Sequence, residues 1–111
     1  MNITEPVEKQ LVAYNNRDID AFVMNFSENC VVEDGMGNRL MEGRAAMYES
    51  YKRMFDASPA LHCTIVKRTV LTEYVLDEEH VTGRMGNPDR GHVVAVYRVE
   101  GGEITHVRFL R

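Results

Sequence analysis

The sequence predicts an α+β domain, because helical patterns fill its first half and strand patterns fill its second half. Before Pro59 the apolar residues recur at helical spacing. After Pro59 they alternate with polar residues in short segments rich in Val, Ile, Thr and Tyr. The chain has 111 residues, which is the usual size of one domain. We therefore expect a single domain over residues 1–111, with a sheet curled around helices.

Three helices are expected before Pro59. The first begins near Pro6, since proline is tolerated at the first helical position, and the second begins after Asp18, a residue type that caps helices. The third begins near Gly43 and ends before Pro59, which disfavours a helical residue in front of it. Their apolar stripes are, in order, Val7, Leu11 and Tyr14; Ile19, Phe22, Val23 and Phe26; and Met47, Tyr48, Tyr51, Met54 and Phe55.

The strands form two groups. Residues 31–34 predict a short strand, and residues 35–38 predict an irregular loop after it. Turn signals at residues 77–78, 87–89 and 101–102 divide the second half of the chain. The expected strands there are residues 61–66, 69–75, 79–85, 91–99 and 104–110, the first two of which form either one bent strand or two. A meander of this kind predicts an antiparallel sheet with one face buried on the helices.

Charge and hydropathy exclude several classes of function. The formal net charge is −4, so the chain lacks the basic surface that nucleic-acid binding requires. No apolar run approaches the roughly 20 residues that span a bilayer, and residues 1–6 do not form a signal peptide. We therefore expect a cytoplasmic protein with no membrane partner. Cys30 and Cys63 lie in apolar stretches, which is typical of reduced, buried thiols.

The four histidines, His62, His80, His92 and His106, show no spacing typical of metal ligands. No phosphate-binding loop is present either, because residues 35–37 lack the required glycine and lysine pattern. We expect neither a metal nor a cofactor.

Three motifs resemble a known family. They are Asp18-Ile19-Asp20-Ala21, then Val32-Glu33-Asp34 about ten residues later, and then Gly43-Arg44 opening a helix. With the terminal strands they resemble the ketosteroid isomerase and SnoaL-like polyketide cyclase group of the nuclear transport factor 2-like superfamily. The resemblance implies a cystatin-like α+β barrel, in which a cone-shaped, curved antiparallel sheet wraps around three N-terminal helices and an apolar pocket. The superfamily contains isomerases, cyclases, hydrolases, dehydratases and non-enzymatic binders, so the fold alone assigns no activity.

Asp34 is the main catalytic candidate. The resemblance places it where the isomerases carry the aspartate that moves a proton between carbons next to a carbonyl group. A carboxylate at the end of a buried strand would be desolvated, and its pKa would rise toward that of a useful base. The alternative is a solvated aspartate that caps the Gly35 turn.

A base of this kind needs donors that stabilise the developing oxyanion. By ungapped counting, the positions of the two donors in the isomerases hold Gln10 and Ala95 here. Tyr51 falls where some isomerases carry a supporting tyrosine, and Tyr14, one helical turn after Gln10, could replace the missing phenol. We therefore expect Tyr14 and Tyr51 to act with Asp34. For Tyr14, Tyr51, Tyr97 and Arg84 an ordinary core or rim role is the alternative, and for Met54 it is core filling. The expected substrate-binding residues are Phe26, Met54, Phe55, Arg84, Tyr97, Val107 and Phe109.

The outer face of the last two strands mixes apolar and charged residues, which is typical of an interface between subunits. We expect a homodimer through this face, which carries His92, Val94, Val96, His106 and Arg108. The function expected from the resemblance is binding of a small apolar carbonyl compound, with movement of an α-proton by Asp34. Two alternatives remain: a non-catalytic, small-molecule-binding dimer of the same fold, and a dimer whose core is filled and has no pocket.

Overall fold

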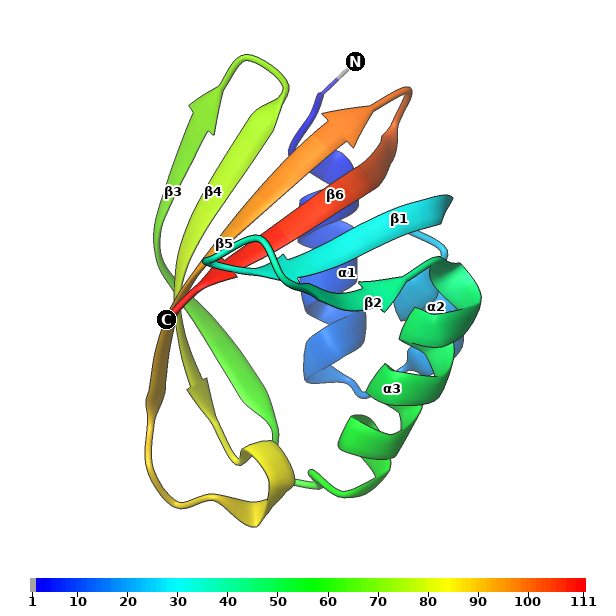
Figure 1. Ribbon diagram of the computed structural model, residues 1–111. Helices are drawn as coiled ribbons and strands as arrows, with labels where there is room; N and C mark the ends of the chain where they lie inside the picture. Colours follow the sequence, from blue (N-terminus) through cyan, green and yellow to red (C-terminus); the bar gives the residue numbers. More distant parts are fainter. Residues whose placement is uncertain (1) are drawn as a thin grey trace.

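The computed structural model describes residues 2–111, and over this range the chain forms three α-helices and six strands (Figure 1). The helices are α1 (Glu5–Asn15), α2 (Ile19–Val23) and α3 (Arg44–Asp56). The strands are β1 (Phe26–Asp34), β2 (Arg39–Glu42), β3 (His62–Leu71), β4 (Tyr74–Thr82), β5 (Gly91–Glu100) and β6 (Glu103–Leu110). A short 3₁₀ turn, η1 (Arg84–Gly86), connects β4 to β5. The predicted α+β class is confirmed.

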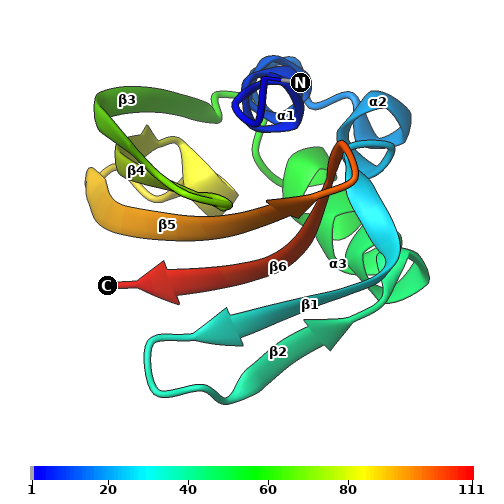
Figure 2. The same ribbon diagram turned by 90° about the horizontal axis from the view of Figure 1, so that it is seen from above.

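The six strands form one open, curved sheet in the order β2-β1-β6-β5-β4-β3. The three helices lie on its concave side (Figures 1 and 2). Neighbouring strands are antiparallel with one exception, the parallel pair of β1 and β6. The expectation of an antiparallel sheet is therefore corrected to a mixed sheet. β1 and β6 can run parallel because most of the chain connects them, whereas the tight turns between consecutive strands enforce antiparallel pairing.

The strand expected at residues 31–34 begins five residues earlier than predicted, at Phe26, and a second strand, β2, was not predicted. Ser27, Glu28 and Asn29 are polar and largely outside the core, so no strand pattern marks them. β2 is a short edge strand that pairs only with β1 and is mostly exposed. An edge strand without a buried face carries no hydrophobic alternation for sequence analysis to detect.

The turn expected at residues 77–78 is wrong. The chain turns at Thr72 and Glu73 instead, and β4 runs without interruption from Tyr74 to Thr82. β3 is one strand, with an irregularity between Ile65 and Lys67. The turns expected at residues 87–89 and 101–102 are confirmed. The consequence of the shifted hairpin is that two acidic residues lie inside a buried strand.

The core fills the space between the helices and the concave face of the sheet. Val7 from α1, Phe22 from α2 and Met47 from α3 are at most 2% exposed. The sheet contributes Phe26, Val32, Val75, Ala95, Val99, Ile104 and Val107 to the same cluster. Cys30 and Cys63 are buried, free thiols, as expected. Across residues 2–111, none of the helices combines the length and apolar character needed to cross a bilayer.

Candidate functional site

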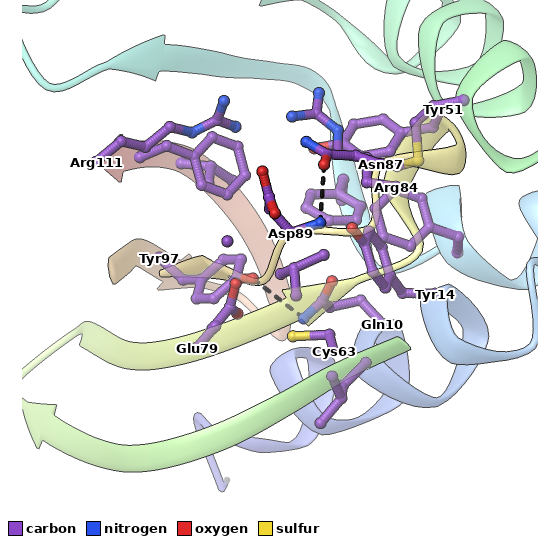
Figure 3. A pocket seen from close by; sticks show the side chains of 18 residues that line it. Gln10, Tyr14, Tyr51, Cys63, Glu79, Arg84, Asn87, Asp89, Tyr97 and Arg111 are labelled. Carbon is purple, nitrogen blue, oxygen red and sulfur yellow. Dashed lines mark hydrogen bonds between the residues drawn. The ribbon is translucent and has the colours of Figure 1, made fainter. Parts of the chain in front are cut away.

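A cavity of about 180 Å³ lies between the helices and the concave face of the sheet (Figure 3). Its apolar wall is formed by Leu11, Phe22, Phe26, Met54, Val81, Val107 and Phe109. Its polar groups belong to Gln10, Tyr14, Tyr51, Cys63, Glu79, Arg84, Asn87, Asp89, Tyr97 and Arg111. A mainly apolar hollow with a few polar groups is typical of a small-molecule site.

The helical side of the cavity is an aromatic cluster. The Tyr51 ring packs on Phe22 with 4.6 Å between centroids, and the Tyr14 ring meets Phe55 edge-on at 5.5 Å. Burial raises the pKa of both tyrosines well above the usual value. Their hydroxyl groups therefore stay protonated at neutral pH and are available as hydrogen-bond donors.

Glu79 is the one acidic side chain of the sheet that lines the cavity within residues 2–111. It lies on the concave face of β4 and is only 5% exposed. Burial, and after it the negative charge of Asp77, raise the pKa of Glu79 from 4.5 to about 7. The side chains of Cys63 and Tyr97 partly offset the increase by interacting with the carboxylate. A carboxyl group with a pKa near neutrality can both accept and return a proton under cellular conditions.

Tyr97 and Gln10 form a hydrogen-bonded pair next to Glu79 (Figure 3). The Nε2 group of Gln10 donates to the Tyr97 hydroxyl oxygen at 3.2 Å and to the carbonyl oxygen of Val7 at 3.1 Å. The Tyr97 hydroxyl keeps its own proton as a donor, and the Tyr97 side chain lowers the pKa of the neighbouring Glu79. Gln10 therefore holds the hydroxyl of a phenol that lies beside the carboxylate.

Asp77 lies two residues before Glu79 on the same face of β4 and is fully buried. Arg68 from β3 binds it with two nitrogen atoms, at 2.7 Å to Oδ1 and 2.9 Å to Oδ2. The same guanidinium group reaches Glu8 of α1 at 3.2 Å. This bidentate pair neutralises Asp77 and connects the sheet to α1.

The loop between β4 and β5 brings three polar residues to the mouth of the cavity: Arg84, Asn87 and Asp89. Two contacts fix its start. Gly83 has φ +75°, and a Cβ atom there would lie 2.3 Å from the carbonyl oxygen of Ala60, so only glycine fits. The backbone N–H of Met85 donates to the hydroxyl of Ser58, which is fully buried. Arg84 thus reaches the cavity from a 3₁₀ turn, not from the expected strand.

Asp34 does not line the cavity. Its carboxylate accepts hydrogen bonds from the backbone N–H groups of Met36 and Asn38, both at 2.9 Å, and from the Asn38 side chain at 3.0 Å. These bonds, that of the Asn38 side chain foremost, hold the pKa of Asp34 below its usual value. The expected rise of this pKa by desolvation is therefore wrong. The structure favours the alternative, a carboxylate that holds the turn after β1.

The other sequence-derived candidates are placed as follows. Tyr14 and Tyr51 reach the cavity, and so do Phe26, Met54, Arg84, Tyr97, Val107 and Phe109. Phe55 does not line it and is a core residue, 4% exposed, that packs behind Tyr14 and Phe22. Its expected place in the pocket is corrected, because its position on α3 directs the ring into the aromatic cluster.

Sequence reasoning missed Glu79. A turn was expected at residues 77–78, so Glu79 fell at the first position of the expected strand 79–85, directly after the turn, and was not considered as a site residue. One signal was available: Asp77 and Glu79 have the same parity as Val75 and Val81. A strand drawn through all four would have placed two carboxylates on its apolar face, where acidic residues are costly and therefore informative.

The family of SnoaL-like domains matches residues 7–107. A solved structure of an uncharacterized cystatin-fold protein from Novosphingobium aromaticivorans is similar over 100% of this chain and 99% of its own, with 29% identity and a TM-score of 0.91. The sequence resemblance to the nuclear transport factor 2-like superfamily is thereby confirmed. No curated protein matches the chain significantly.

Two more distant structures share the fold. One is a protein from Catenulispora acidiphila with a ketosteroid isomerase-like fold, in complex with trimethylamine (24% identity, 95% of this chain and 83% of that one, TM-score 0.77). The other is an LEH-like epoxide hydrolase from M. tuberculosis (24% identity, 97% of this chain and 80% of that one, TM-score 0.81). At these identities the likeness shows the fold and does not assign a ligand or a reaction.

Proposed function

The chain belongs to the family of SnoaL-like domains, and from this premise we propose that its cavity binds a small carbonyl compound and that Glu79 moves a proton between carbon atoms next to the carbonyl group. The observation that carries the proposal is the buried carboxyl group of Glu79, which faces the cavity and has its pKa raised to about 7. Perturbed carboxyl groups of this kind concentrate at functional sites. Glu79 takes the role that the sequence resemblance suggested for Asp34.

The size of the cavity limits the ligand. A dry cavity of about 150 Å³ holds benzene, and the cavity here measures about 180 Å³. It therefore suits one ring or a branched chain of similar size, with part of a larger ligand extending through the mouth. The apolar wall favours a ligand whose enclosed part is hydrocarbon.

The chemistry needs no cofactor. The ionised carboxylate of Glu79 takes a proton from the carbon next to the carbonyl group. The electron pair of that C–H bond forms a C=C bond, and the π electron pair of the carbonyl group moves to its oxygen, which gives an enolate. The protonated Glu79 then returns the proton to the same carbon or to a conjugated one, so that the reaction is an exchange or an isomerisation. Acid–base catalysis by one well-placed group contributes roughly 10²–10⁴-fold.

The developing oxyanion requires donors on the other side of the ligand. Tyr14 and Tyr51 supply two buried hydroxyl groups from the helical wall. Tyr97, oriented by Gln10, contacts Glu79 and stabilises its ionised form. We assign Tyr14 and Tyr51 as oxyanion donors and Tyr97 as a positioning residue.

The proposal is tested by deuterium exchange at the α-carbons of cyclohexanone in D₂O, followed by proton NMR. We expect the wild-type protein to accelerate the exchange and Glu79→Gln to lose the acceleration while still binding the ketone. Asp34→Asn is the matched control and should exchange as fast as the wild type. Exchange at the wild-type rate in Glu79→Gln would show that another group is the base.

A non-catalytic binding protein is the second candidate. One observation favours it: the two positions that hold oxyanion donors in the isomerases are Gln10 and Ala95, and Ala95 is a fully buried methyl group. The same experiment separates the two candidates. Cyclohexanone that binds to the wild-type protein without any accelerated exchange would identify a binding protein.

We also propose that two copies of the chain associate through the convex face of the sheet, where His92, Val94, Val96, His106 and Arg108 lie. Polar groups on this face pair with each other: Arg108 binds Glu33 at 3.2 Å, His106 also contacts Glu33, and His92 binds Glu78 at 2.7 Å. Because these polar groups have partners within the chain, Val94 and Val96 are available for an apolar contact. Light scattering should give twice the chain mass of 12.7 kDa, and a monomer mass would refute the dimer.

A cytoplasmic location is proposed as well, to be tested by cell fractionation.

A further inference from the structure

Two arginines from distant parts of the sequence, Arg84 and Arg111, line the cavity and are exposed at its mouth. Arg84 comes from the turn after β4, and Arg111 follows β6. Both arginines line the cavity, and the positive charges of both act on the Tyr51 side chain, so both lie within electrostatic reach of the same wall (Figure 3). Arg111 lies over the ring of Phe109, with 5.4 Å from its guanidinium carbon to the ring centroid. This contact holds a positive charge against the cavity wall.

Neither arginine forms a salt bridge to any carboxylate of residues 2–111. Five other arginines have carboxylate partners: Arg39, Arg44, Arg68, Arg98 and Arg108. Arg17, Arg53 and Arg90 form no salt bridge within residues 2–111 either, but they do not line the cavity, so Arg84 and Arg111 differ from them in placing two unpaired charges at one cavity. Like charges at one cavity repel each other, and an anion bound between them offsets the repulsion. A planar guanidinium group binds a carboxylate through two parallel hydrogen bonds, and a pair of arginines binds it more selectively than one.

Asp89 also lines the mouth of the cavity, and its negative charge repels an anion there. Its charge offsets one of the two arginines, so the three groups together leave one net positive charge. Glu79, at the other end of the cavity, also repels an anion when it is ionised. An anionic ligand would therefore enter with its charged group at Arg84 and Arg111 and its apolar part toward Glu79.

We infer that the ligand of this cavity is a small organic acid, whose carboxylate binds Arg84 and Arg111 at the mouth while its ring or branched chain fills the apolar interior. The inference rests on the proposed function, in that it takes the cavity as the ligand site, and it narrows the carbonyl compound to an oxo acid. The net charge of −4 of the whole chain does not oppose this, because charges close to the ligand dominate over screened, distant ones.

The test compares benzoate with benzamide, two one-ring probes of nearly equal shape that differ in charge, by isothermal titration at neutral pH. We expect benzoate to bind about tenfold or more tightly than benzamide, since charge-assisted hydrogen bonds are about twice as strong as neutral ones. Arg84→Gln and Arg111→Gln should each weaken benzoate binding by about tenfold and leave benzamide binding nearly unchanged. Asp89→Asn should strengthen benzoate binding, because it removes the opposing charge.

Arg90→Gln is the matched control. Arg90 is exposed, lies next to Asp89, forms no salt bridge within residues 2–111 and does not line the cavity. It should leave the affinity for benzoate nearly unchanged. All four positions are exposed, so the variants should unfold at the wild-type temperature.

The outcomes separate this inference from the proposed function. Equal affinity for both probes, or equal losses in Arg84→Gln and Arg90→Gln, would overturn the organic-acid assignment and leave the cavity as a ligand site. Failure of both probes to bind would overturn the assignment and the proposed ligand site together.

Discussion

Two carboxyl groups of β4, Asp77 and Glu79, lie two residues apart on the same buried face and have opposite surroundings. Asp77 accepts hydrogen bonds from the Nε and Nη2 groups of Arg68. Glu79 faces a cavity and has no arginine partner. The cross-strand register explains the difference, because Arg68 lies directly opposite Asp77 on β3, whereas Glu79 lies between Ile65 and Val93. One strand thus carries a neutralised structural charge and a titratable group.

The comparison shows how the fold keeps a carboxyl group near its point of titration. Burial between apolar neighbours raises the pKa of Glu79, and the nearby negative charge of Asp77 raises it further. Arg68 limits that increase, because its positive charge lies beside Asp77 and lowers the pKa of Glu79. The charges of Asp77 and Arg68 therefore act in opposite directions on the pKa of Glu79.

The largest expected effect is the loss of stability when Asp77 loses its arginine partner. Arg68→Met leaves the fully buried Asp77 without a partner, so we expect the free energy of unfolding to fall by about 3–5 kcal/mol. Urea denaturation followed by circular dichroism measures it. Arg90→Met, at an exposed arginine with no salt bridge within residues 2–111, should change stability by less than about 0.5 kcal/mol. A loss in Arg68→Met as small as in this control would show that Asp77 does not depend on Arg68.

The second effect is the pH dependence of the free energy of unfolding that Glu79 causes. The pKa of Glu79 rises from 4.5 to about 7 on folding, so between these two values the folded protein holds a proton that the unfolded chain has lost. The contribution of Glu79 to the free energy of unfolding is therefore greatest below pH 4.5 and falls as the pH rises to 7. The full change is on the order of 3 kcal/mol.

Glu79→Gln removes this contribution. The difference in unfolding free energy between wild type and variant, measured by urea denaturation across the pH range, should follow the fall described above. A difference that stays constant with pH would mean that Glu79 has the same pKa in the folded and unfolded states.

The third effect is a change in the pKa of Glu79 when the charge of Asp77 is removed. Asp77→Asn removes the negative charge and leaves that of Arg68, so the pKa of Glu79 should fall by about one unit. NMR titration of the Glu79 carboxyl carbon measures the shift. In Asp77→Asn with Arg68→Met both charges are absent, and the pKa should lie above that of the single variant. An unchanged pKa in Asp77→Asn would show that the two carboxyl groups do not interact.

The smallest effect is expected at Asp34, the carboxylate that the resemblance favoured. Asp34→Asn should loosen residues 35–38, because two backbone N–H groups and the Asn38 side chain lose an ionised acceptor. Amide hydrogen exchange measures the loosening. The affinity of the cavity for cyclohexanone should stay within about twofold, as is usual for substitutions away from a site. A large loss of affinity would show that Asp34 contributes to ligand binding.

The elements that sequence analysis predicts well are those with one strongly apolar face. The stripe from Met47 to Phe55 predicted α3, and the alternation in residues 91–99 and 104–110 predicted β5 and β6. β2 escaped because an exposed edge strand has no apolar face. The β3–β4 hairpin was misplaced because the three acidic residues from Asp77 to Glu79 have the composition of a turn.

The residues of the candidate site also differ in how well the sequence predicts them. Tyr14, Tyr51 and Tyr97 line the cavity, and they were accessible to sequence reasoning because helical spacing and strand parity fix the face on which they lie. Glu79 was missed, because its parity with Val75 and Val81 counts only if one strand runs through all three residues, and that depends on the pairing with β3 and β5. That register is a property of the whole sheet.

The central claim is that Glu79 titrates near neutrality inside the cavity, and the most direct test is its own titration. The carboxyl carbon of Glu79, assigned by comparison with Glu79→Gln, is followed by ¹³C NMR from acid to neutral pH in the ligand-free protein. We expect a midpoint near pH 7. A midpoint near 4.5, the ordinary value for a glutamate, would show that Glu79 is a solvated carboxylate and that it is not the base of this cavity.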